Sequence, residues 1–169
     1  QLTTVIIMKG VTTIGERAFK GCDQLTTVII PGSVTTIGES AFEDCVRLED
    51  IIIPNGVKSI GNRAFNECWS LETVIIPVSV TAIGTDAFGL CSELKTVVIG
   101  KGVTKIYNSF AECGKLKELY IHHNILTKDL IEIVDYEREE TREGVNMGFK
   151  ILYNVQGVNF HMSLDNVYV

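Results

Sequence analysis

LTTVIIPGSVTTIGESAFEDC, residues 25–45, is repeated along the chain and determines its fold. The cysteine that closes this stretch recurs at almost constant spacing, at Cys22, Cys45, Cys68, Cys91 and Cys113. Phenylalanine, leucine, valine and isoleucine positions recur in the same phase. A fixed period of this length predicts a solenoid, a propeller or an array, and the repeat is too short for a propeller blade or two full helices.

One repeat can be divided into local elements from its residue types. Residues 25–30 are rich in β-branched side chains and predict a strand, which Pro31 and Gly32 end. Residues 34–37 predict a second short extended segment, and residues 39–44 predict one helical or 3₁₀ turn. Strands of successive repeats are expected to stack in parallel about 4.8 Å apart, giving six strands between residues 2 and 121.

The apolar side chains of one coil are too many for that coil to bury alone. Stacking places like on like, so the Phe, Leu, Val, Ile, Ala and Cys positions of neighbouring coils should form one continuous hydrophobic core. Each fully buried large side chain contributes about 1.5–3 kcal/mol, so the repeats should supply most of the stability.

The repeated stretch resembles the BspA-like leucine-rich repeat, also called the Treponema pallidum type, over residues 2–121. The resemblance implies about five 23-residue coils with a stacked parallel β-sheet, in the α/β repeat class. It also implies a non-catalytic module of bacterial cell-surface or secreted proteins that adheres to host proteins or other cells. The last coil departs from the pattern, with Tyr107 for Gly and Ser109 for Ala, and Met8, Gly100 and His122 replace the Pro.

A further departure concerns the outward position of each strand, where the family often has Thr. Here the position is apolar, and because neighbours in a strand point to opposite faces, stacked copies should form an exposed apolar stripe beside a polar row. A contiguous exposed apolar stripe marks an interface. The alternatives are that the stripe favours parallel pairing or is covered by the C-terminal segment. The candidate protein-binding residues are Thr27, Ile29, Asp50, Ile52, Thr73, Ile75, Thr96, Val98, Glu118 and Tyr120.

The periodicity ends at His122, and residues 122–169 differ in character. Residues 128–143 predict a helix with Thr127 as its N-cap, and two alternating runs flank Gln156-Gly157 as in a β-hairpin. A solenoid end exposes core edges, so we interpret residues 1–121 as the solenoid and 122–169 as a C-terminal α+β cap. An independent small domain or a poorly ordered tail is the alternative.

Composition excludes several classes of function. The formal charge of -6 argues against a nucleic-acid groove, and no apolar run reaches the length of a membrane-spanning helix. No catalytic or nucleotide-binding motif occurs, so we expect no enzyme activity and no cofactor. Five stacked cysteines suit buried reduced thiols better than disulfides or a zinc site. Trp69 is expected on an outer corner of its coil, as a partly packed loop residue or a contact anchor.

The sequence opens at Gln1 inside the repeat pattern, so we interpret it as a piece of a longer protein whose targeting signal lies elsewhere. The first hypothesis is a surface-displayed or secreted module that binds a protein ligand through its sheet. A structural spacer in a larger surface protein and an intracellular interaction scaffold, which would be cytoplasmic, are the alternatives.

Overall fold

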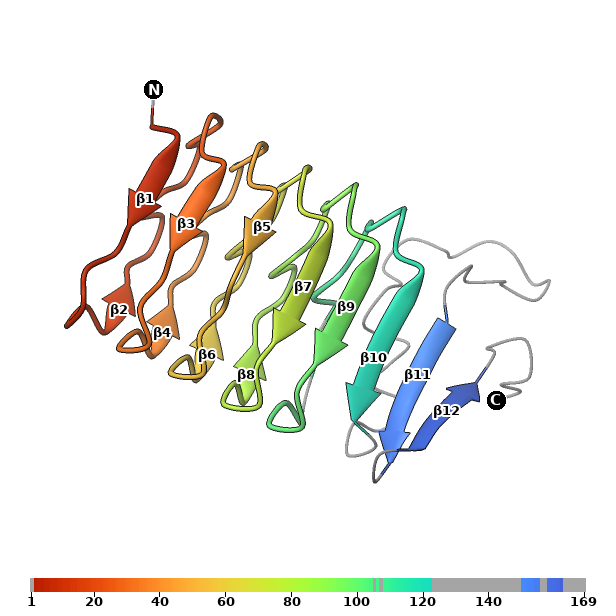
Figure 1. The fold of residues 1–169 in the computed structure, drawn as a ribbon. Helices are drawn as coiled ribbons and strands as arrows, with labels where there is room; N and C mark the ends of the chain where they lie inside the picture. Colours follow the sequence, from red (N-terminus) through yellow and green to blue (C-terminus); the bar gives the residue numbers. More distant parts are fainter. Residues whose placement is uncertain (1, 105, 107, 123–149, 156–157, 163–169) are drawn as a thin grey trace.

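The computed structural model describes residues 2–104, 106, 108–122, 150–155 and 158–162, and it shows a stack of coils that each contribute one strand to a long sheet (Figure 1). This sheet has eight strands in the order β1-β3-β5-β7-β9-β10-β11-β12. The strands are β1 (Thr4–Ile6), β3 (Thr27–Ile29), β5 (Asp50–Ile51), β7 (Thr73–Ile76), β9 (Thr96–Ile99), β10 (Glu118–His122), β11 (Lys150–Val155) and β12 (Val158–Met162).

The second extended segments of the first four coils form a smaller parallel sheet (Figure 1). Its strands are β2 (Thr13–Ile14), β4 (Thr36–Ile37), β6 (Ser59–Ile60) and β8 (Ala82–Ile83). In both sheets each residue of a repeat lies beside its equivalent in the next repeat, as in the pairs Thr27 with Asp50 and Ile37 with Ile60. The predicted leucine-rich-repeat solenoid is therefore confirmed.

One hydrophobic core runs along the stack, and its centre is a column of five phenylalanine rings. Neighbouring ring centroids lie 5.1–5.4 Å apart and the ring planes differ by 6–12°. Equivalent Leu, Val, Ile and Ala side chains surround the column and belong to the same cluster. The expectation of a single continuous core is confirmed, and the rings are Phe19, Phe42, Phe65, Phe88 and Phe110.

The segment after the second strand, which we call the turn layer (residues 39–44 and their equivalents), forms successive tight turns in place of the α-helical turn, which was one of the two predicted alternatives. Ser40 and Asp44 have φ angles of 54° and 63°, so left-handed residues interrupt any helix. This conformation turns alternate N–H groups toward the next coil, where Ser40, Phe42 and Asp44 donate to backbone carbonyls at 2.7–3.0 Å. These bonds between coils alternate with bonds of the 3₁₀ type inside the segment, such as the one from the N–H of Glu43 to the carbonyl of Ser40 at 3.2 Å.

The cysteines are unpaired thiols, four buried and Cys22 half-buried. Sγ of Cys45 lies 3.2 Å from the carbonyl oxygen of Phe19 in the preceding coil, and Cys68, Cys91 and Cys113 repeat this contact at 3.2–3.3 Å. They are therefore hydrogen-bond donors as well as small apolar side chains. Burial raises the pKa of the Cys45 thiol to about 12, which keeps it protonated.

The C-terminal strands extend the large sheet. β11 pairs in parallel with β10, and β12 pairs antiparallel with β11 with Val155 opposite Val158, which confirms the predicted hairpin. The helix predicted over 128–143 lies outside the described residues, and the division into solenoid and cap stays a prediction. Among the residues that the structure describes, no helix is long and apolar enough to cross a membrane.

Candidate protein-binding face

The outer face of the eight-stranded sheet carries the predicted apolar stripe. In β3 and β7 the residues that flank the outward isoleucine are buried, because they point into the core. The exposed fractions are 52% for Ile29, 80% for Ile52 and 58% for Ile75. Val98 and Tyr120 continue the stripe in register and are half-buried. The stripe therefore reaches solvent in the central coils.

A polar row lies two residues before the stripe on the same face. Thr27, Asp50 and Thr73 occupy successive strands in register and are exposed, whereas Thr96 is half-buried. Glu118 ends the row in β10 and accepts a hydrogen bond from the Tyr120 hydroxyl at 3.3 Å. Desolvation raises the pKa of that phenol, and the nearby Glu118 carboxylate raises it further. The structure thus brings the ten predicted residues onto one face, as two adjacent rows.

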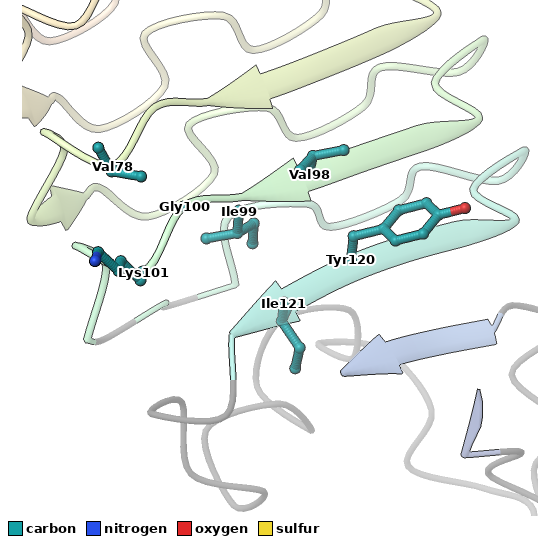
Figure 2. Close-up of a pocket in the computed structure, with 7 residues that line it drawn as sticks. All are labelled: Val78, Val98, Ile99, Gly100, Lys101, Tyr120 and Ile121. Atoms are coloured by element: carbon teal, nitrogen blue, oxygen red, sulfur yellow. The ribbon is translucent and has the colours of Figure 1, made fainter. Parts of the chain in front are cut away.

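The stripe leads into a pocket between β9 and β10, with a volume of about 310 Å³ (Figure 2). Val98 and Tyr120 of the stripe line it, together with Val78 and Gly100. Gly100 stands where three other coils have Pro, and a Cβ atom there would lie 2.7 Å from the backbone nitrogen of Val78, so the backbones of the two coils lie close together beside the pocket. Sequence reasoning noted Gly100 as a departure but did not include it or Val78 among the site residues. The replacement of Pro by Gly at position 100 could have indicated the pocket, because a departure from a strict repeat marks a position where packing differs.

The chemistry of this face is that of a contact surface. Its side chains are aliphatic, hydroxyl or carboxylate groups, with one phenol, and a row of exposed aliphatic groups gains free energy when a partner covers it. No group of three or more His, Cys, Asp or Glu residues in the described part of the chain could hold a metal ion. Trp69 is 49% exposed in the turn that follows Cys68, a partly packed loop residue away from the sheet face.

Three comparisons place the chain among known proteins. The model of the BspA type leucine-rich-repeat region matches residues 1–117 with six copies. No curated protein matches the sequence. A leucine-rich-repeat protein from Bacteroides ovatus is 37% identical with a TM-score of 0.67, over 71% of this chain and 31% of that one. The leucine-rich-repeat protein of T. pallidum is 34% identical with a TM-score of 0.67, over 70% of this chain and 58% of that one.

A more distant structure shares the fold alone. The pneumococcal vaccine antigen PcpA is 19% identical with a TM-score of 0.71, over 91% of this chain and 36% of that protein. The chain therefore spans between about a third and three-fifths of the length of the proteins that it resembles.

Proposed function

Because the chain belongs to the BspA-type leucine-rich-repeat family, whose members are generally protein-interaction modules, we propose that it binds a protein ligand through the outer face of its eight-stranded sheet. The observation that carries this proposal is the exposed apolar stripe, with Ile52 at 80% exposed. An isolated surface isoleucine needs no explanation, but a row of them in register forms a continuous patch.

The ligand that fits this face is an extended or flat protein surface with apolar side chains at its centre. Apolar contacts along the stripe would supply affinity, and the polar row beside it would form the rim of the interface. The pocket between β9 and β10 would accept one apolar side chain as an anchor, since its floor includes the buried side chains of Ile99 and Ile121 (Figure 2).

We propose further that the chain acts in adhesion, as part of a cell-surface or secreted protein. Support comes from the resemblance to the BspA-like repeat and from identity above 30% to repeat proteins of two bacteria. A structural spacer is the second candidate function. It is favoured by the uninterrupted phenylalanine column and two continuous sheets, which make consecutive coils one rigid unit.

The decisive experiment replaces Ile29, Ile52 and Ile75 by Thr, which removes the stripe and keeps β-branched side chains in the sheet. A matched control is Ala82→Thr, which adds the same side chain at an exposed position of the other sheet. A photo-crosslinking residue at position 52 would identify the bound protein on intact cells, and a second one at position 82 would report background.

The affinity for the crosslinked protein would then be measured by surface plasmon resonance. The triple variant should bind at least about tenfold more weakly, since burial of even one isoleucine contributes about 1.5–3 kcal/mol. Its melting temperature should stay within a few degrees of the parent, and the Ala82→Thr control should bind normally. Unchanged affinity together with a lower melting temperature would refute the interface and support the spacer.

A further inference from the structure

The turn layer carries a depression of about 570 Å³, and none of the ten candidate face residues lines it. Its lining includes equivalent positions of successive coils, and the side chains at these positions shorten from Glu43 in the second coil to Gly89 in the fourth. A Cβ atom at Gly89 would lie 2.7 Å from Nδ2 of Asn66, so a side chain cannot be accommodated there unless Asn66 moves. The absence of a side chain at position 89 therefore helps to form the depression. The equivalent positions are Lys20, Glu43, Asn66, Gly89 and Ala111.

Most of the charged residues that line this depression are acidic. Glu67 and Glu112 occupy the same turn position in different coils, and Asp86 and Glu43 complete a set of four carboxylates in the lining, which also contains one guanidinium, that of Arg63. Lys20 already holds the Glu43 carboxylate at 2.8 Å. The remaining three carboxylates give the depression a net negative charge, which favours a cationic ligand.

Two asparagines show that the depression is prepared for hydrogen bonding. Asn66 is only 7% exposed, and its side-chain amide makes no hydrogen bond with any residue in the described ranges. Asn108 donates through Nδ2 to Oδ1 of Asp86 at 3.2 Å, but its own Oδ1 is buried without a partner in the part of the chain that the structure describes. The amide of Asn66 therefore retains hydrogen-bonding capacity that a ligand in the depression could use.

We propose that this depression binds the guanidinium group of an arginine side chain from a partner protein. Guanidinium carries five N–H donors in a planar fork, enough for two or more carboxylates and an asparagine oxygen at once, whereas an ammonium group has only three. Leu90 and Ala111 offer apolar contact to the aliphatic stem. A metal ion fits less well, since the acidic residues of the described ranges form no cluster of three close enough to share one.

The test uses Nα-acetyl-arginine amide as the probe and its citrulline analogue, which is neutral and nearly isosteric, as the control ligand. Titration into ¹⁵N-labelled protein should shift the amide resonances of Gly89 and Ala111 saturably with the arginine probe only. Asp86→Asn should weaken binding about tenfold, because it removes a charge-assisted hydrogen bond. Arg63→Gln should strengthen binding severalfold, because it removes a positive charge from the lining that repels the probe.

The opposite effects of these two variants make the proposal falsifiable even if one variant is less stable. Should Asp86→Asn fail to fold, Glu112→Gln at an exposed position provides the same test of charge. Equal shifts with the citrulline analogue would overturn the proposal, as would unchanged affinity in the acidic variants. Displacement of the arginine probe by CaCl₂ at lower concentration, with shifts at the same amides, would assign the depression to a metal ion and refute it too.

Discussion

The phenylalanine column predicts that one interior ring stabilises the fold far more than the ring at the N-terminal end. Phe65 is fully buried and lies between two parallel rings, with centroid distances of 5.2 Å to Phe42 and 5.1 Å to Phe88. Phe19 is half-buried and stacks on one ring only, at 5.2 Å. The substitutions Phe65→Ala and Phe19→Ala remove the same atoms, so they form a matched pair.

The expected magnitudes follow from this packing. Removing a buried phenylalanine side chain costs about 3–5 kcal/mol, and each aromatic pair adds about 0.5–1.5 kcal/mol beyond the area buried. Phe65→Ala should therefore lower the free energy of unfolding by about 5 kcal/mol, because rings on both sides prevent collapse of the cavity. Phe19→Ala should lower it by only about 2 kcal/mol, since part of the Phe19 surface is already in water.

Urea unfolding followed by circular dichroism and by the fluorescence of Trp69, the chain's single tryptophan, measures both values. Phe65→Ala should also lower the dependence on urea concentration, because loss of the central contact uncouples the coils on its two sides. Phe65→Leu, which retains most of the volume, should fall between the parent and Phe65→Ala. Equal destabilisation by the two alanine variants would refute the idea that stacking along the column carries the stability.

Three further predictions test other layers of the coil. Gly61→Ala should destabilise the protein by at least about 2 kcal/mol in thermal unfolding, because its Cβ would lie 2.6 Å from a backbone nitrogen of the preceding coil. Gly15→Ala, which has open space around it, should be neutral or slightly stabilising. Iodoacetamide at pH 8 should alkylate half-buried Cys22 first, and mass spectrometry should find the four buried thiols unmodified. The reason is that burial shields these thiols from the reagent and raises the pKa of Cys45 to about 12. Equal labelling of all five cysteines would contradict this prediction. Burial raises the pKa of the Glu43 carboxyl, but hydrogen bonds from its lysine and serine partners lower this pKa below 4.5 overall. The ionised carboxylate therefore stabilises the fold above about pH 4.5, and this stabilisation is lost as the pH falls through the folded pKa. The melting temperature of Glu43→Gln should accordingly fall less between pH 7 and pH 3.5 than that of the parent.

The sequence predicted the strands and the core because both depend on the same repeat period. Once Phe42 and Phe65 are one period apart, stacking of coils brings them together, whatever the details of the loops. The outward orientation of Ile29 and Ile52 follows from alternation in a strand, so the exposed stripe was predictable too. These features need only the order of residue types.

The turn layer could not be predicted in the same way. Ser40 and Arg63 adopt left-handed backbone conformations, which cost about 1–2 kcal/mol in a residue other than glycine, and their residue types suit an exposed helical turn equally well. The hydrogen bonds to the next coil that offset this cost exist only after stacking. The depression around Gly89 was missed for a related reason, since it depends on side chains from four coils at once.

The turn layer also has an electrical direction of its own, opposite to that of the amides beside the second strands, such as Thr35 and Gly38, which donate toward lower residue numbers. In the first four coils, three amides per coil donate toward higher residue numbers, among them Arg17 to Glu39, Phe42 to Ala64 and Phe65 to Ala87. The peptide dipoles of these amides are parallel, so their partial charges add along the stack as they do in an α-helix, with the positive end toward the C-terminal coils. A transplanted coil would have to keep this polarity, since a reversed one would set carbonyl against carbonyl and amide against amide.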